Sequence, residues 1–189
     1  NNIQLKSGLW EELMHSFIGP LANGDIVLAP VEGSWHFCVC ADSGKLDSIV
    51  QEADCLREEP VLLVDSIKAM KGFVDLHPRI ETLLNFHHKA LDLYFSEFRL
   101  NSDRMSMKLD RLIVRKNCDP VWDKLLSECG RPVFIIPLKH QTDTAEVYTQ
   151  LPEEIMSCVD FWIPGLSPGQ FRKVPRASIN HAGDLEFLP

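Results

Sequence analysis

Short continuous runs of apolar residues alternate along the chain with stretches in which apolar residues recur every third or fourth position. The continuous runs are typical of buried strands, and they occupy residues 25–29, 34–41, 59–64, 133–138 and 159–163. The periodic stretches are typical of amphipathic helices, and they occupy residues 7–21, 45–53, 67–73, 78–86, 120–129 and 152–157. The pattern predicts a sheet covered by helices.

Proline and capping residues set the expected boundaries of these elements. Gly19-Pro20 is expected to break or end the first helix. Asp65 is expected to cap the helix that follows it, and Asp119-Pro120 to begin a later one. Pro30 is expected to stop the first strand, so that residues 30–33 connect it to the second.

Two later stretches, at 91–100 and 109–114, mix polar with apolar residues, which favours antiparallel pairing. The tail at 174–189 fits a hairpin that turns around residues 181–183. Alternating helices and strands before a β-rich end predict an α/β fold on a twisted mixed sheet with flanking helices. A chain of 189 residues, 45% hydrophobic, suits one domain over residues 1–189.

The chain is acidic, with 27 Asp and Glu against 19 Lys and Arg and a net charge of −8. Nucleic acids are held largely by Lys and Arg that neutralise phosphates, so generic nucleic-acid binding is disfavoured. A local basic patch is still a candidate RNA contact, and its members are Arg111, Arg115, Lys116, Arg131, Lys139 and His140.

Six irregularly spaced cysteines suit free thiols in a reducing compartment, and we expect a cytoplasmic protein. No apolar run has the roughly 20 residues that a membrane span needs, so no membrane partner is expected. The sequence begins at Asn1, and a removed leader before it stays open.

The connection between the first two strands is the first candidate for a binding site, because polar groups at strand ends are exposed at the edge of a sheet. Two interpretations fit Glu32 and Trp35 equally: the lining of a pocket, or a solvated turn carboxylate beside a core aromatic. Arg115 is predicted at a strand end, where it would either bind an anionic ligand or form a surface ion pair with Asp110 or Asp119. We favour the ligand.

Cys38, Cys40 and His36 are predicted on one face of one strand, which is compatible with a metal site. Core packing explains the same pattern more simply, so no metal site is assigned. The sequence has no nucleophile elbow beside a Cys–His pair and no Gly-rich phosphate loop. No catalytic residue is assigned.

The stretch 30–38, PVEGSWHFC, resembles the PTDTVYGLG signature of the YrdC-like family. Pro30 and Glu32 match its Pro and acidic residue, and Trp35 stands where it has Tyr. The run at 59–64 is similar to the family's KPL strand. Three further stretches are similar to its AVRVPDHP, GKPLVSTSAN and VDLILDGG motifs, and they read DRLIVRKNCDP at 110–120, GRPVFII at 130–136 and VDFWIPG at 159–165. The resemblance implies a YrdC-like fold.

Many members of this family make threonylcarbamoyl-adenylate from threonine, bicarbonate and ATP for tRNA modification, so the resemblance implies ATP as a ligand. It also implies which groups are missing. The family's Lys-x-Arg pair, the Lys of KPL, Ser-x-Asn and a C-terminal Ser-Thr fall at Ala53 and Cys55, Glu59, Pro137 and Lys139, and Arg176 and Ala177. Arg115 alone matches outright, while Arg57 lies two residues from the lost Arg.

Two main hypotheses follow. In the first, the chain is a YrdC-like protein related to threonylcarbamoyl-adenylate synthases that binds a nucleotide or small anionic ligand, with its catalysis lost or altered. Its predicted binding residues are Pro30, Glu32, Trp35, Arg57 and Arg115. In the second, it is a non-catalytic module that binds a protein or double-stranded RNA on the concave face of the sheet. An active synthase with relocated cations is a third reading, so enzyme activity is left open.

Overall fold

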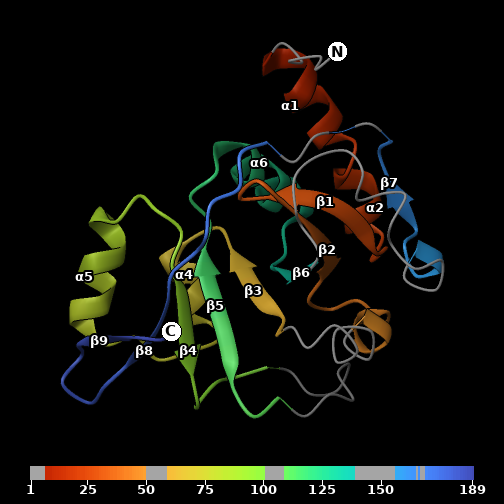
Figure 1. The fold of residues 1–189 in the computed structure, drawn as a ribbon. Coiled ribbons are helices and arrows are strands. Elements are labelled where there is room, and N and C mark those ends of the chain that lie inside the picture. The colour runs from red at the N-terminus through yellow and green to blue at the C-terminus, as the bar shows by residue number, and fades with distance from the viewer. Residues whose placement is uncertain (1–6, 50–58, 101–108, 139–155, 165, 167–168) are drawn as a thin grey trace.

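The computed structural model describes residues 7–49, 59–100, 109–138, 156–164, 166 and 169–189. The strands of this part of the chain are β1 (Val27–Val31), β2 (Ser34–Cys40), β3 (Val61–Val64), β4 (Asp92–Phe95), β5 (Leu112–Lys116), β6 (Val133–Pro137), β7 (Phe161–Trp162), β8 (Arg176–Ile179) and β9 (Leu185–Phe187). They form one sheet in the order β7-β1-β2-β6-β3-β5-β4-β8-β9 (Figure 1). Parallel and antiparallel pairs both occur, which confirms the predicted α/β fold on a mixed sheet.

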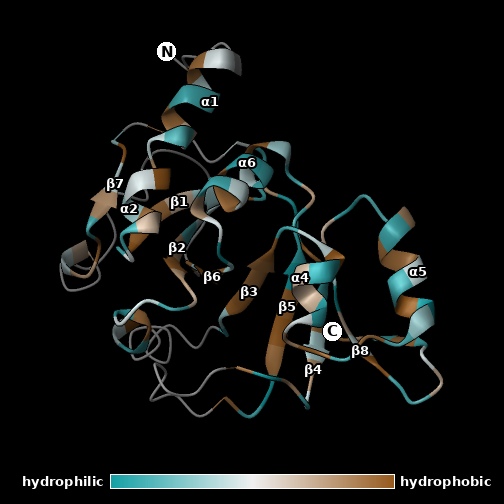
Figure 2. Cartoon of the chain, turned by 180° about the vertical axis from the view of Figure 1, so that it is seen from behind, coloured by the Kyte–Doolittle hydropathy of each residue, from teal (hydrophilic) through white to brown (hydrophobic). Residues whose placement is uncertain are grey.

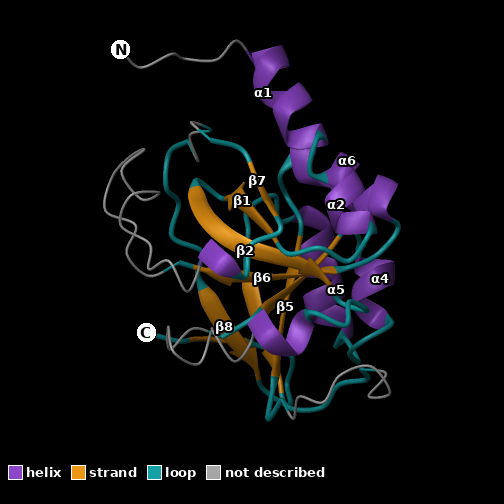
Figure 3. Ribbon diagram, turned by 90° about the vertical axis from the view of Figure 1, so that its right-hand side faces the viewer, coloured by secondary structure: helices purple, strands orange, loops and turns teal. Residues whose placement is uncertain are grey.

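The helices are α1 (Ser7–His15), α2 (Ile18–Ala22), α4 (Ile67–Lys71), α5 (Pro78–Phe86) and α6 (Pro120–Cys129). Figure 3 shows α1, α2, α4 and α6 along one side of the strands. Residues 46–49 are also helical, and the rest of the helix predicted at 45–53 lies outside the described residues. Most of the helix predicted at 152–157 lies outside them as well.

Several boundaries follow the caps expected from the sequence. The Asp119 carboxylate accepts a hydrogen bond of 2.9 Å from the Val121 N–H at the start of α6. Gly130 ends that helix with a φ of 65°, a left-handed conformation that glycine adopts without strain. The antiparallel pairing of β4 with β5 and the C-terminal hairpin of β8 and β9 were also predicted correctly.

Three predictions about helix ends were wrong. The stretch at 7–21 forms two helices, but the break falls at Ser16 and Phe17, and Pro20 lies inside α2 instead of breaking or ending a helix. A proline is tolerated there because the first turn of a helix does not need its N–H groups for intrahelical bonds. Ser66 rather than Asp65 caps α4, and its Oγ accepts a hydrogen bond of 3.1 Å from the Ala69 N–H.

Pro30 was predicted to stop the first strand, and this was wrong. It lies within β1, opposite Trp35. Val31 and Ser34 close the hairpin, and Pro30 and Trp35 form the next pair. In a two-residue hairpin, the residues of this next pair point their backbone N–H and C=O groups away from the partner strand. On that outer side β7 pairs with Val27 and Leu28, short of Pro30, so the missing N–H costs no ladder hydrogen bond. The carbonyl of Pro30 is satisfied by the indole N–H of Trp122, at 2.9 Å.

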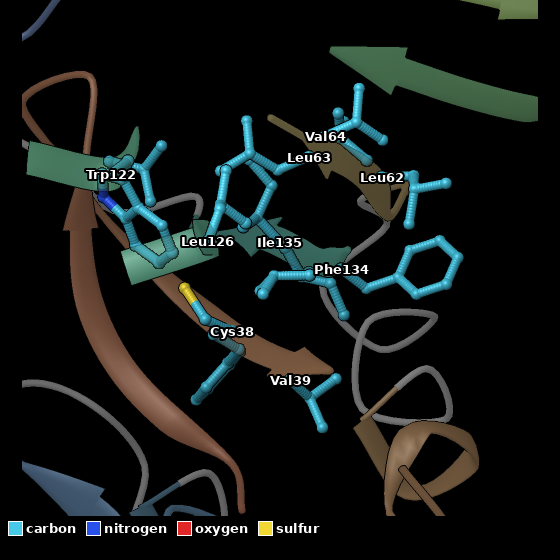
Figure 4. Packing of buried hydrophobic residues seen from close by; sticks show 14 of the residues in the cluster. Cys38, Val39, Leu62, Leu63, Val64, Trp122, Leu126, Phe134 and Ile135 are labelled. Carbon is cyan, nitrogen blue, oxygen red and sulfur yellow. The ribbon is translucent and has the colours of Figure 1, made fainter. Parts of the chain in front are cut away.

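The core lies between the central strands and α6. Figure 2 shows hydrophobic β3 and β5 beside helices that also carry hydrophilic residues. In Figure 4, Cys38 of β2 points towards Trp122 and Leu126 of α6, and Cys38 and Trp122 have no exposed surface. Burial of such large apolar groups is the main favourable contribution to folding. Among the described residues, none of the helices is long and apolar enough to cross a membrane.

The turn between β1 and β2 consists of Glu32 and Gly33, which have φ angles of 49° and 74°. Two positive φ angles match a type I′ hairpin turn. The Arg172 N–H donates a hydrogen bond of 3.1 Å to the Glu32 carbonyl, so the segment 170–172 crosses the turn. A Cβ at Gly33 would overlap the Gln170 carbonyl oxygen. The turn therefore requires glycine for two reasons, its conformation and the closeness of this segment.

We expect Gly33→Ala to lower the free energy of unfolding by at least about 2 kcal/mol, because it adds a backbone clash to the cost of a left-handed alanine. Gly130→Ala is the matched control, since Gly130 has a φ of 65° and nothing within 4 Å of the added Cβ. It should cost about 1 kcal/mol. Urea denaturation measures both values, and equal losses would show that the segment 170–172 does not press on the turn.

Candidate functional site

A cavity of about 610 Å³ lies beside the turn between β1 and β2. Its lining includes Ser34 and His36 from β2, Asp92 from β4, Arg115 from β5 and Arg176 from β8. Sequence positions far apart therefore meet at one place because their strands belong to one sheet, in which β5, β4 and β8 are neighbours and β2 lies beyond β3 and β6. Cavities of this size are typical of small-molecule sites.

The most buried charged groups of the cavity are Arg115 and Asp92, with 5% and 1% of their surfaces exposed. Their Cα atoms are directly opposite in the β4–β5 ladder. The Arg115 Nε donates to one carboxylate oxygen at 2.6 Å, and Nη2 donates to the other at 3.0 Å. Such a bidentate pair fixes the plane of the guanidinium.

The third nitrogen of the guanidinium, Nη1 of Arg115, is buried and has no hydrogen-bond partner in the described structure. The side chain lines the cavity, so a molecule bound there can accept this hydrogen bond. A buried donor without a partner costs about 1–3 kcal/mol, and a ligand that accepts from it removes this cost. This donor is the clearest binding feature of the site.

His36 lies in the same cavity and is 4% exposed. Its Nδ1 is 3.0 Å from the Ser34 carbonyl oxygen, which can only accept, so Nδ1 carries the proton and Nε2 has a free lone pair. Burial, together with the nearby charge of Arg115, lowers the pKa of His36 to about 3. The imidazole is therefore neutral at pH 7 and presents an acceptor.

The segment 171–176 lines the cavity and carries three cations, Arg172, Lys173 and Arg176. Arg172 and Lys173 are exposed, and Arg176 is half-buried next to Asp92 in the β4–β8 ladder. None of the three forms an ion pair with another described residue. A positive rim on a chain of net charge −8 attracts anions locally.

The residues predicted from the sequence are divided between the cavity and the core. Glu32 and Arg115 line the same cavity. Pro30 and Trp35 are buried in the core, Trp35 with 1% of its surface exposed, and neither lines this cavity. Arg57 lies outside the described residues. The partner of Arg115 is Asp92, and not Asp110 or Asp119 as the ion-pair alternative proposed.

Sequence reasoning missed Asp92, His36 as a hydrogen-bonding group, and the basic rim. The run FRKVPR at 171–176 is a concentration of positive charge in an acidic chain and could have indicated the rim. Nothing in the sequence marks Asp92, because its role comes from the register of β4 against β5.

The predicted basic patch is largely neutralised where the structure describes it. Arg111 pairs with Glu59 and Arg131 pairs with Asp42, both at the surface. Lys139 and His140 lie outside the described residues. No group of His, Cys, Asp and Glu in the described part of the chain is arranged to hold a metal ion. Burial raises the pKa of the Cys38 thiol and raises that of Cys40 to about 12.

A second cavity, of about 800 Å³, lies next to the first, and both are lined by Glu32, Arg172 and Lys173. His87, His88 and Lys89 add further basic groups to the second cavity. The chain from Arg172 to Pro175 therefore borders two cavities.

We expect Asp92→Ala to lower the free energy of unfolding by about 3–5 kcal/mol, because it leaves a buried guanidinium without its counter-charge. The paired variant Asp92→Ala, Arg115→Met should be more stable than Asp92→Ala. The exposed pair provides a control, since Glu59→Gln should cost less than about 1 kcal/mol. Urea denaturation at pH 7 measures these values. A paired variant less stable than Asp92→Ala would contradict the ion pair.

The low pKa of His36 in the folded protein should make the free energy of unfolding depend on pH. The unfolded chain protonates His36 near the ordinary pKa of 6.5, whereas the folded protein does so near pH 3. The unfolded state binds more protons between these values, so the free energy of unfolding falls as the pH is lowered through them. The loss from pH 7 to pH 5 should be about 2 kcal/mol and should be absent in His36→Gln. Urea denaturation at both pH values tests this, and parallel losses in parent and variant would contradict it.

Several solved structures resemble the chain. HypF, in its phosphate- and nucleotide-bound form, has a TM-score of 0.70 and 16% identity over 93% of this chain and 28% of HypF. P. abyssi Sua5 complexed with L-threonine has a TM-score of 0.62 and 16% identity over 89% of this chain and 51% of Sua5. E. coli YciO has a TM-score of 0.66 and 13% identity over 89% of this chain and 84% of YciO.

The chain thus spans about a quarter of the HypF chain and about half of the Sua5 chain. No family model matches its sequence, and no curated protein matches it in sequence. The similarity is one of structure at low sequence identity. It confirms the fold that the sequence motifs implied: the chain is a divergent protein of the YrdC-like fold.

Proposed function

We propose that the chain binds a nucleotide or another small anionic ligand in the cavity beside Arg115, and that it does not carry out threonylcarbamoyl-adenylate synthesis. The observation that carries this proposal is the buried Nη1 of Arg115, which has no hydrogen-bond partner in the described structure and belongs to a side chain that lines the cavity. Arg115 is also the one cation of the resembling family's motifs that this sequence keeps outright.

The rim supports an anionic ligand. Arg172, Lys173 and Arg176 border the cavity, and each can form charge-assisted hydrogen bonds that are stronger than neutral ones. The solved neighbours are consistent with this, since HypF was solved in a phosphate- and nucleotide-bound form and one Sua5 structure is a complex with L-threonine.

The proposed loss of synthesis rests on the positions that correspond to the family's nucleotide-binding groups. Glu59 stands where the family has a Lys, and it is held by Arg111 at the surface. Pro137 borders the cavity at the position of a hydroxyl or amide side chain and offers no side-chain donor. Each lost charged hydrogen bond to the triphosphate would cost about 1.5–3 kcal/mol.

Calorimetry with ATP, AMP and inorganic phosphate tests the binding. We expect at least one nucleotide to bind with a Kd on the order of 100 μM. Arg115→Lys should weaken this binding at least roughly tenfold, because lysine keeps a positive partner for Asp92 but loses the free Nη1–H. The matched control is Lys124→Gln, an exposed cation on α6 away from the cavity lining, and it should leave the affinity unchanged.

A second measurement tests the loss of catalysis. With ATP, threonine and bicarbonate, we expect no pyrophosphate release above the protein-free rate. Release that depends on all three substrates would identify an active synthase with relocated cations. If neither ATP, AMP nor phosphate binds, the proposed ligand is wrong, and a non-catalytic module for a protein or RNA partner is favoured.

A further inference from the structure

Arg115, Asp92 and His36 together bring little net charge to the cavity, although the half-buried Arg176 next to Asp92 also lines it. The guanidinium of Arg115 is matched by the carboxylate of Asp92, which accepts from it at 2.6 and 3.0 Å. His36 adds no charge, because burial and the nearby Arg115 hold its pKa at about 3. An anion moved into this place would lose its hydration and would meet a positive charge that is already paired.

Two hydrogen-bonding atoms of Arg115 and His36 have no partner among the described residues. The donor is the Nη1–H of Arg115, and the acceptor is the Nε2 lone pair of His36, which forms no hydrogen bond with a described residue. The edge of a nucleobase presents acceptors and donors side by side and complements both groups. A phosphate dianion presents acceptors alone, so its lone pairs would face that of Nε2.

The other parts of the cavity suit the rest of a nucleotide. Arg172 and Lys173 are exposed at the rim, where an anionic group can keep part of its hydration. Apolar side chains also line the cavity, among them Pro137, Val174 and Phe171, whose side chain is 62% exposed. Flat bases stack on such surfaces.

We propose that a nucleoside monophosphate binds with its base inward, hydrogen-bonded to Arg115 Nη1 and His36 Nε2, and with its phosphate outward at Arg172 and Lys173. This inference rests on the proposed nucleotide-binding function and adds the orientation of the ligand. Arg115, the cation that matches the family's motif, then recognises an uncharged group, while Arg172 and Lys173 recognise the charge.

The test is calorimetry with AMP, GMP, CMP and UMP, followed by the nucleoside of the best binder and by ribose 5-phosphate. The nucleotide should bind at least tenfold more tightly than ribose 5-phosphate, which keeps the anion and lacks the base. Ribose 5-phosphate binding as tightly as the nucleotide would overturn the orientation.

Three variants test the two ends of the ligand separately. His36→Leu should weaken the nucleotide and the nucleoside by about five- to tenfold, the effect of one hydrogen bond, and leave ribose 5-phosphate unchanged. His36→Gln, which retains an acceptor, should restore part of the affinity. The double variant Arg172→Gln, Lys173→Gln should weaken the nucleotide and leave the nucleoside unchanged. A thermal unfolding transition for each variant confirms that it folds.

Three outcomes would contradict the inference, two of them against the orientation of the ligand and one against the proposed function. If His36→Leu weakens ribose 5-phosphate as much as the nucleotide, the phosphate lies inward and the orientation is wrong. If the rim variant weakens the nucleoside as much as the nucleotide, the base lies at the rim. If the parent protein binds none of the nucleotides, the proposed function itself fails, and the inference fails with it.

Discussion

The buried ion pair between Arg115 and Asp92 is the constraint on which the account of the site depends. Each of these charges would be costly to bury alone, and the pair is tolerated because two parallel hydrogen bonds satisfy the carboxylate and most of the guanidinium. The two residues face each other only when β4 and β5 pair in the observed register. A shift by one residue would move one of them to the opposite face, so fold and site are coupled here.

The same pair also determines which group of Arg115 is left without a partner. Asp92 fixes the guanidinium through Nε and Nη2 and leaves Nη1 without a hydrogen-bond partner in the described structure. His36 stands where the resembling signature has a glycine, and it adds an acceptor to the same cavity. Arg176 falls near the position of a hydroxyl-bearing pair, so positive charge has a different distribution in this chain.

Much of the fold could be predicted from the sequence, since buried strands and amphipathic helices leave strong apolar patterns. Continuous runs such as Val61–Val64 gave strands, and Asp119-Pro120 gave the start of α6. Pro30 was misread, because whether a proline ends a strand depends on which side of it is paired, and that is a property of the sheet. Arg115 could be selected from its motif, whereas Asp92 could not. The two residues are separated by 23 positions, and the sequence between them carries no signal of the register that joins them.

A crystal structure of the protein grown with AMP tests the central claim most directly, that a paired Arg115 offers its remaining donor to a ligand in the cavity. The account predicts a base edge within hydrogen-bond distance of Arg115 Nη1, an intact pair between Arg115 and Asp92, and the phosphate beside Arg172 and Lys173. A guanidinium turned away from Asp92 to hold the phosphate, or AMP bound outside the cavity, would contradict it.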